Sequence, residues 1–412
     1  MIEITSSPVG RVTLIEVKGR VDSISAPELD AALRQEIDNG HKAIVLDLAG
    51  VDYMSAAGLR VLRYVHTTLG KVRISRPSVR IREVLQITGL DTSYQLHENR
   101  VDAIHALTPV TNAHTHLELG WLANYRPGVG GAPFFEWIVG LVQRRRAVGD
   151  KLTATCTKAI EAGIQSLLDS GTTVVGDISG TGLSVAPLLE SGLKGVVYLE
   201  VIGSNLDFGT KTLNWARTIV DKWRAKERNG MRLGVSIHSP YSVHPDLWKQ
   251  GLDYIRKEAL PLCIHVAESQ AERDYLLNGT LTDMDIYYRG LGLEGVPSPK
   301  KTPVHYLEDL GALELKPLLV HAVEVDVSDI QRIKKSGSAV VHCPRSNLRL
   351  RCNRMPLEKF LDASVPVYFG TDSLSSSPSL NVLDELEVAA ALHYGKVRPE
   401  LLENLVHQTL PV

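Results

Sequence analysis

The chain contains the stretch VTNAHTH at residues 110–116, a short strand that runs directly into two histidines. Because alternate side chains of a strand point to the same side, His114 and His116 are expected to face one direction, as two ligands of one metal ion would. An H-x-H pair alone is a weak signal, and two ordinary core or surface histidines are the alternative. The pair gains weight only if other strands end in a similar way.

Seven further apolar runs follow this strand, separated by polar loops and by helices such as residues 155–168 and 246–258. The seven strands are expected at residues 172–175, 195–199, 233–237, 261–266, 318–320, 339–341 and 365–369. Eight strand–helix units in about 300 residues predict a (β/α)8 TIM barrel over residues 108–412, in the α/β fold class.

Most of these strands run into a histidine or an aspartate at the end where barrel enzymes keep their catalytic groups. After strand one, the residues concerned are His238, His265, His321, His342 and Asp372. The fifth strand also leads to Glu268, three residues after its histidine. Chance would scatter the 14 histidines over helices and loops. Five strands that each bring a histidine to one rim therefore indicate an active site.

The motifs at these strand ends resemble the amidohydrolase superfamily, in its branch of deaminases with one metal ion. The matching segments are NAHTHLEL (112–119), HSPY (238–241), HVAE (265–268), VHA (320–322), HCPRSN (342–347) and GTDS (370–373). The resemblance implies that His114, His116, His265 and Asp372 hold one divalent metal ion, zinc in first place and iron as the alternative. Binuclear relatives need a bridging Lys or Glu at the end of strand four, which IHS at residues 237–239 does not provide.

The resemblance also implies a catalytic role for three residues. A divalent metal ion lowers the pKa of bound water towards neutrality, and Asp372 would take the proton of that water. Glu268 would protonate a ring nitrogen of the substrate and pass a proton to the leaving ammonia. His321 would polarise the water or steady the tetrahedral centre. Triazine chlorohydrolases can dispense with the glutamate, so its presence favours deamination over dechlorination.

Within this branch, FFEWI at residues 134–138 and the HCPRSN segment look most like aminodeoxyfutalosine deaminases of menaquinone biosynthesis. Deaminases of S-adenosylhomocysteine and methylthioadenosine are close behind. The implied reaction is hydrolytic deamination of the adenine ring of a nucleoside modified at its 5′ position. The implied substrate contacts are His238, Glu118, His342 and Ser373.

Several of these contacts have an alternative interpretation. His238 could instead support a metal ligand, and Glu118 could be a salt-bridged carboxylate at the rim. The run RRR at residues 144–146 is expected to be a solvated helix face, with a grip on an anionic substrate tail as the alternative.

The first 107 residues predict a separate, smaller α/β domain, with strands near residues 12–17, 43–48 and 72–74 between helices. The segments 45–62 and 84–90 resemble the STAS domain of anti-sigma factor antagonists. Ala56 stands where switchable members carry the phosphorylated serine, and alanine has no hydroxyl to modify. Ser55 is expected to be a helix N-cap. We therefore expect a docking module or a relic rather than a working switch.

Composition is that of an ordinary globular protein: 44% hydrophobic and 22% charged residues, with a net charge of −2. No basic field favours nucleic acid, and no apolar run approaches the ~20 residues that a membrane span needs. The amino terminus lacks the layout of a signal peptide, so a cytoplasmic location is expected. A protein partner of the STAS-like domain and a homo-oligomer are both left open.

One departure from the resemblance concerns the barrel's flank. Relatives usually wrap the barrel with a small β-sandwich made from both chain ends. Here the STAS-like domain runs almost directly into strand one and the sequence stops at Val412, so we expect a barrel that lacks most of the sandwich.

Two other functions compete with adenine deamination. One is hydrolysis of another heterocycle, such as guanine, cytosine or a triazine. The other is a non-catalytic nucleoside sensor whose STAS-like domain contacts a partner. Intact proton-transfer residues argue against the sensor, because a protein that only binds needs none.

Overall fold

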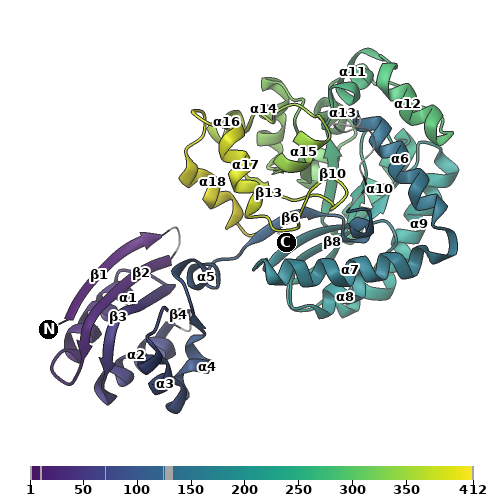
Figure 1. The fold of residues 1–412 in the computed structure, drawn as a ribbon. Helices are drawn as coiled ribbons and strands as arrows, with labels where there is room; N and C mark the ends of the chain where they lie inside the picture. The colour runs from purple at the N-terminus through teal and green to yellow at the C-terminus, as the bar shows by residue number, and fades with distance from the viewer. Residues whose placement is uncertain (1, 10–11, 70, 124, 126–132, 411–412) are drawn as a thin grey trace. The chain divides into compact units, whose positions relative to one another are not determined.

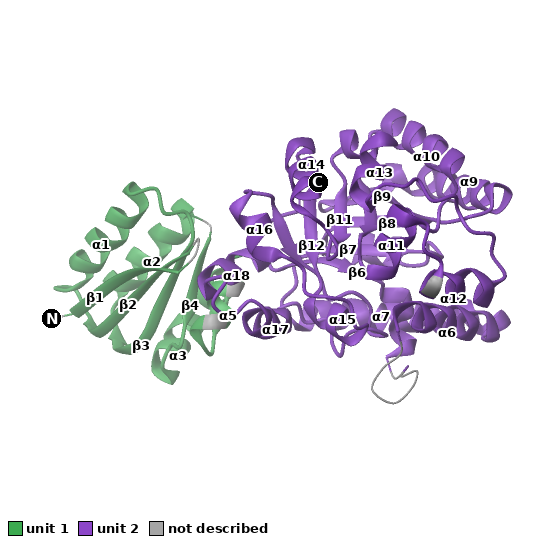
Figure 2. Ribbon diagram, turned by 90° about the horizontal axis from the view of Figure 1, so that it is seen from above, with its two compact units in different colours: residues 1–109 green, residues 110–412 purple. Residues whose placement is uncertain are grey.

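The computed structural model describes residues 2–9, 12–69, 71–123, 125 and 133–410. The chain forms two compact units, residues 1–109 and 110–412, which Figure 2 shows in green and purple. The small first unit and the barrel of the second both agree with the fold class expected from the sequence.

Unit 1 is a five-stranded sheet with helices on both faces (Figure 1). The strands lie in the order β1 (Ile2–Val9), β2 (Val12–Val21), β3 (Ile44–Met54), β4 (Val72–Ser75) and β5 (Leu96–His97). The first pair is antiparallel and the other pairs are parallel. The helices are α1 (Ala26–Asp38), α2 (Ala56–Leu69), α3 (Val79–Ile87), α4 (Leu90–Tyr94) and α5 (Arg100–His105).

Alternation along the strands of unit 1 separates two apolar layers. Ile15 and Val17 of β2 pack with α1, α2 and α3, whereas Val12 and Leu14 belong to the opposite layer, which includes Ala103 of α5. Each face of the sheet is thus covered by apolar side chains from at least one helix.

Ser55 is the residue directly before α2, and its Oγ accepts a hydrogen bond from the amide of Gly58 at 3.4 Å. This is the N-cap geometry expected from the sequence. Ala56, the first residue of the helix, is exposed and carries no hydroxyl.

Unit 2 is an eight-stranded parallel sheet whose strands follow one another in chain order, as in a TIM barrel (Figure 1). The strands are β6 (Thr111–Thr115), β7 (Val174–Ser179), β8 (Lys194–Val201), β9 (Met231–Ile237), β10 (Leu262–Val266), β11 (Leu318–His321), β12 (Ala339–His342) and β13 (Val367–Phe369). All eight expected strands are present. Every named strand among the described residues of this unit belongs to this one sheet, so no sandwich flanks the barrel there.

Helices surround the barrel. Those before β10 are α6 (Phe134–Ala147), α7 (Leu152–Asp169), α8 (Val185–Glu190), α9 (Leu206–Trp223) and α10 (Pro245–Glu258). After β10 come α11 (Gln270–Asn278), α12 (Thr282–Leu291), α13 (Pro303–Asp309), α14 (Val327–Ser336), α15 (Pro344–Arg349), α16 (Leu357–Asp362), α17 (Asp384–Leu392) and α18 (Pro399–Val406). Short 3-10 helices lie at Leu117–Leu122, Gly149–Lys151, Arg224–Lys226 and Ala312–Leu315.

Hydrogen bonds across the first and last strands close the barrel. The side-chain amide of Asn112 on β6 accepts from the amide of Thr371 at 3.0 Å and donates to its Oγ1 at 2.9 Å. The amide of Asp372 donates to the carbonyl of His114 at 3.0 Å. These bonds bring the histidines of β6 next to the aspartate that follows β13.

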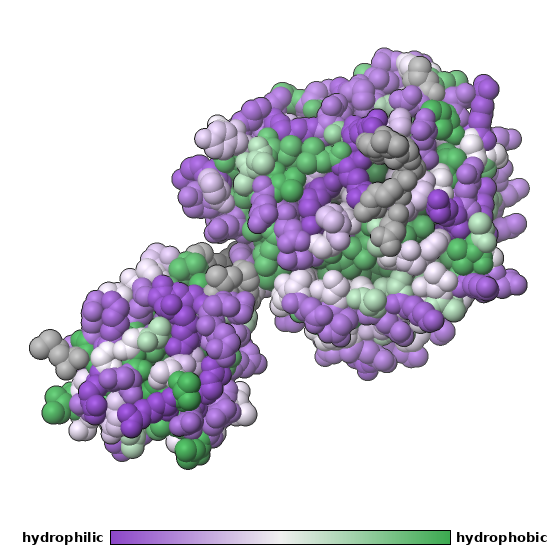
Figure 3. Space-filling model, viewed as in Figure 1, coloured by the Kyte–Doolittle hydropathy of each residue, from purple (hydrophilic) through white to green (hydrophobic). Residues whose placement is uncertain are grey.

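Apolar side chains are largely withdrawn from the outer surface. Figure 3 shows hydrophilic residues over most of the visible face of each unit, with hydrophobic residues in smaller patches. Among the described helices, none combines the length and the apolar character that crossing a bilayer requires.

A charged cluster near α16 makes stability depend on pH. Arg354 donates from both terminal nitrogens to the two carboxylate oxygens of Glu358, at 2.7 Å each. This pairing lowers the pKa of Glu358 from 4.5 to about 2. Because the folded pKa is depressed, the stabilisation is complete above pH 4.5 and is lost as the pH falls towards 2.

Glu358→Gln is therefore expected to lower the free energy of unfolding by up to about 3 kcal/mol at pH 7 and by clearly less at pH 3.5. Urea denaturation of both proteins at the two pH values measures this. Glu190→Gln is the matched control, because Glu190 is 70% exposed and its pair with Arg228 is worth little. An equal loss for Glu358→Gln at both pH values would contradict the assignment.

Candidate active site

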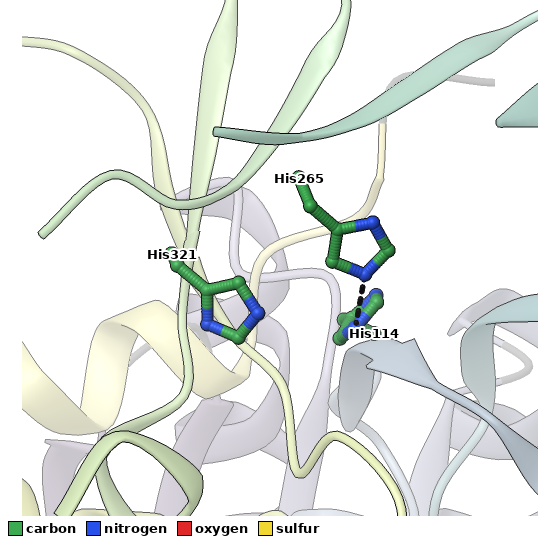
Figure 4. A group of neighbouring side chains, drawn as sticks. All are labelled: His114, His265 and His321. Atoms are coloured by element: carbon green, nitrogen blue, oxygen red, sulfur yellow. Dashed lines mark hydrogen bonds between the residues drawn. The ribbon is translucent and has the colours of Figure 1, made fainter. Parts of the chain in front are cut away.

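Histidines from separate strands meet at the carboxyl end of the barrel. The Nε2 atom of His114 lies 3.2 Å from Nε2 of His116 and 3.3 Å from Nε2 of His265. Asp372 approaches from the last strand, with Oδ1 3.6 Å from Nε2 of both His114 and His116. In Figure 4 the rings of His265 and His321 lie close to the ring of His114.

These side chains have the chemistry of a metal site. They form two groups that share His114, one with His265 and His321 and one with His116 and Asp372, and within each group the ligand atoms lie within 4.8 Å of one another. The four residues expected as ligands from the sequence are distributed over both groups.

The protonation states also suit a cation. His265 Nδ1 donates to the carbonyl of His238 at 3.2 Å, so its Nε2 presents a lone pair to His114. Burial lowers the pKa of His116 to about 3, which keeps that ring neutral. The lone pair of His265 thus points to a place where two more imidazole nitrogens and a carboxylate converge, so the residues fit a divalent metal ion.

Asp372 is held in place by hydroxyl groups. Its Oδ2 accepts from Ser346 Oγ at 2.6 Å and from Ser376 Oγ at 2.9 Å, and its Oδ1 accepts from the amide of Ser373 at 2.7 Å. Burial opposes ionisation, but the nearby imidazoles of His114 and His116 hold the pKa of Asp372 well below its usual range. The side chain is therefore a fixed carboxylate.

Glu268 and His321 form the second half of the site. Oε1 of Glu268 lies 3.2 Å from Nε2 of His321, and both side chains are buried. The side-chain amide of Asn347 donates to Nδ1 of His321 at 3.2 Å, which leaves the ring proton on Nε2, facing Glu268. Burial, together with the charge of Asp372, raises the pKa of Glu268 well above its usual value.

The backbone is strained where these side chains leave the barrel. Ala267, His321, Ala322 and Asp372 have φ of 51°, 74°, 45° and 58°, in the left-handed region that side chains other than glycine rarely adopt. Such strain concentrates at functional sites, because only a rigid surrounding maintains it.

A cavity of about 700 Å³ opens onto this centre. Its polar end includes His116, His265, Glu268, His321 and Asp372. Apolar side chains from α6, α9 and α12 form its walls, among them Trp137, Leu141, Phe208, Trp215 and Leu291. The volume is in the range of small-molecule sites.

Three of the four expected substrate contacts line this cavity: His238, Glu118 and Ser373. Glu118 is buried and pairs with Arg145, whose Nη2 is 3.1 Å from Oε1. The carbonyl of His238 supports His265 while its ring lines the cavity, so this residue has features of both interpretations made from the sequence.

His342 lies elsewhere. Alternation along β12 puts Val341 in the barrel interior and Val340 in the layer that packs on the helices, and His342 shares the direction of Val340. Its Nε2 is 3.1 Å from Nε2 of His393, the residue after α17, and it is absent from the cavity lining. The expected contact with substrate therefore has no support in the geometry.

Two charged residues of the cavity wall, Arg145 and Glu200, were not chosen as site residues from the sequence. Arg145 was expected on a solvated helix face, with a grip on an anionic substrate tail as the alternative, and it is half-buried against Glu118, while Arg144 and Arg146 are exposed. Glu200 lies near the end of β8, one residue beyond the strand expected at 195–199. The sequence signal that could have identified Glu200 is an acidic residue directly after the apolar run 195–199.

Comparisons with known proteins agree with this geometry. The sequence profile described as the Amidohydrolase family matches residues 110–402, and that of the STAS domain matches residues 4–103. An aminodeoxyfutalosine deaminase from Deinococcus radiodurans is 38% identical over 306 residues, which cover 72% of this chain and 70% of the relative.

Two further similarities extend this finding. A 5-methylthioadenosine/S-adenosylhomocysteine deaminase from Carboxydothermus hydrogenoformans is 27% identical, and the match covers 72% of this chain and 64% of that protein. The crystal structure of Helicobacter pylori aminofutalosine deaminase in complex with methylthio-coformycin superimposes with a TM-score of 0.60 at 27% identity. That match covers 70% of this chain and 68% of the other.

The serine that holds Asp372 gives a test of the metal site. Ser346→Ala removes the 2.6 Å hydrogen bond to Oδ2 and is expected to weaken binding of zinc by about 10- to 100-fold, because residues that orient a ligand contribute that much. Competition with a chromophoric chelator measures the affinity. Ser336→Ala on α14 is the control, because among the described residues its hydroxyl bonds only Ile333 and Ser338. Equal zinc affinity in both variants would contradict this role.

Proposed function

Because the chain belongs to the amidohydrolase family, we propose that it catalyses metal-dependent hydrolytic deamination of the adenine ring of a 5′-modified nucleoside. Water replaces the exocyclic amino group, and ammonia is released. The observation that carries the proposal is Glu268, a buried carboxyl group that faces the cavity beside the clustered histidines. A reaction that expels ammonia needs such a proton donor.

His114, His116, His265 and Asp372 hold one divalent metal ion in this proposal, with zinc as the first choice and iron as the second. The ion supplies an activated water when it is bound. The neutral imidazoles and the fixed carboxylate described above are the donor set for either metal.

Glu268, His321 and Asp372 move or hold the protons. Asp372 is an ionised carboxylate and accepts a proton from the attacking water. Glu268 has a raised pKa, so it carries a proton that it donates to the ring nitrogen of the adenine. His321 points its Nε2 proton at Glu268 and the reacting carbon, where it stabilises developing negative charge.

The size and lining of the cavity favour a nucleoside substrate larger than adenosine. Its polar end accommodates the base, with His238, Glu118 and Ser373 as candidate contacts. Its apolar walls, including Phe208 and Trp215, suit an apolar extension at the 5′ position. The relatives named for aminodeoxyfutalosine and methylthioadenosine support a substrate of this kind.

The reaction is tested by ammonia release from the zinc- or iron-loaded protein. Aminodeoxyfutalosine, methylthioadenosine, S-adenosylhomocysteine and adenosine form the panel. Turnover of an extended nucleoside above adenosine is expected. Ammonia from guanine or cytosine instead, or none from the panel with one metal ion bound per chain, would contradict adenine-nucleoside deamination.

Glu268→Gln tests the proton donor. The amide keeps the shape of the side chain but cannot deliver a proton, so kcat is expected to fall about 100- to 10,000-fold while one metal ion per chain is retained. Steady-state ammonia assays and elemental analysis measure the two quantities. Glu190→Gln, an exposed position outside the cavity, makes the same chemical change and is expected to leave kcat unaltered. Full activity in Glu268→Gln would refute the assigned role.

A further inference from the structure

Three charged side chains surround one point on the cavity wall, Gly180. A Cβ atom placed on Gly180 would lie 3.0 Å from Oε1 of Glu118, 3.2 Å from Oε2 of Glu200 and 3.4 Å from Nη2 of Arg145. All four residues line the cavity. Only a residue without a side chain leaves these groups room to approach one another.

The two glutamates differ in how their oxygens are used. Oε1 of Glu118 faces Arg145 at 3.1 Å, and Oε2 accepts from the amide and the hydroxyl of Thr181 at 3.0 and 2.7 Å. The side chain of Glu200 forms no hydrogen bond with any described residue. Its nearest ionisable donor is Nε2 of His238, at 4.0 Å, beyond hydrogen-bond range. Glu200 thus has free acceptors on a side chain that is only 17% exposed.

The ring of His238 connects Glu200 to His265, one of the residues proposed to bind the metal ion. The rings of His265 and His238 are 5.1 Å apart between centroids, and His238 is followed by Glu200 at 4.0 Å. A purine with its amino-bearing carbon at the histidine cluster and its ring along His238 would place its sugar at Glu200, next to the apolar side chains of α9.

We propose that Glu200 accepts hydrogen bonds from the two vicinal hydroxyls of the substrate's ribose and thereby selects ribosides. Arg145, held by Glu118, is the positioning residue that offsets the second negative charge. This inference rests on the proposed function and names the group that recognises the sugar.

A neutral diol fits this place better than a cation does. Arg145 already offsets one of the two carboxylates, and an ammonium or metal ion at Glu200 would meet its positive charge. Glu200 is also absent from the potential metal-binding groups formed by the described residues. Two hydroxyl donors satisfy both carboxylate oxygens without adding charge.

The test compares adenosine with 2′,3′-dideoxyadenosine on the metal-loaded full chain. In the wild type, kcat/KM is expected to be about 10- to 100-fold higher for adenosine, because hydrogen bonds to a charged group carry that much discrimination. In Glu200→Gln this ratio is expected to fall to within about threefold of one, mainly through the value for adenosine. Glu190→Gln is expected to keep the wild-type ratio.

Gly180→Ala provides a second variant that leaves every charged group in place. Its Cβ would displace Glu118, Arg145 and Glu200, so the ratio should fall as it does in Glu200→Gln. Circular dichroism melting checks that both variants fold. A ratio near one in the wild type would overturn the inference while leaving deamination intact. An equal loss on both nucleosides in Glu200→Gln would also overturn it, because that is a structural effect.

Failure of the proposed function gives a different result. If the wild type releases no ammonia from any nucleoside, calorimetric binding of the same two compounds takes the place of turnover. Tighter binding of adenosine that is lost in Glu200→Gln would support the inference alone. Equal binding of the two compounds, or no binding of either, would overturn it.

Discussion

The hydrogen bonds of one buried amide, Asn112, are the constraint on which the rest of the site depends. Its side chain bonds both the amide and the hydroxyl of Thr371, a residue 259 positions later in the chain, and also the carbonyl of Leu380. The backbone bond from Asp372 to His114 lies beside it. Because the donors and acceptors are fully buried, leaving one unpaired costs about 1–3 kcal/mol, which favours a single register of closure. Only that register brings the aspartate of the last strand to the histidines of the first.

Closure of the barrel between its first and last strands explains how the strained backbone at the carboxyl ends of the strands is maintained. Regular alternation would direct His321 towards the helices, since Val320 lies in the interior and Leu319 in the outer layer. The positive φ of His321 instead turns its ring into the cavity, beside Glu268. Asp372 departs from regular geometry in the same way. The surrounding parallel strands are buried on both faces, so they resist the relaxation that would remove this strain.

The sequence predicts those features that local patterns determine, and the remaining features depend on tertiary contacts. Eight strands, and histidines and an aspartate at one end of the barrel, follow from apolar runs and from the residues at their ends. The choice of His114, His116, His265 and Asp372 as one group follows from the resemblance to amidohydrolases. The direction of the His342 side chain depends on which residues of β12 point into the barrel. If the alternation were shifted by one residue, His342 would point into the barrel interior and not towards the helices. The same limit applies to Asn112, whose partners are far away in the sequence.

The charged residues of the cavity wall were hidden for another reason. Arg145 stands in a run of three arginines, and Glu200 lies at the end of an apolar strand. Composition alone makes the first look solvated and gives the second no partner. Their burial becomes visible only when α6 and β8 are placed beside the same cavity. Long polar side chains reach well beyond their own helix or strand, so their environment is a property of the assembled barrel.

Two carboxyl groups in one cavity must have opposite protonation states for the proposed chemistry, and the structure provides a physical cause for each. Asp372 accepts three hydrogen bonds and faces two imidazoles, which stabilise its negative charge. Glu268 is equally enclosed, but no cationic side chain pairs with it among the described residues, and the charge of Asp372 repels a second anion. The carboxylate that must accept a proton therefore helps to keep the proton on the group that must donate it. This coupling assigns the base and the acid from their environments, because the two residues share the same functional group.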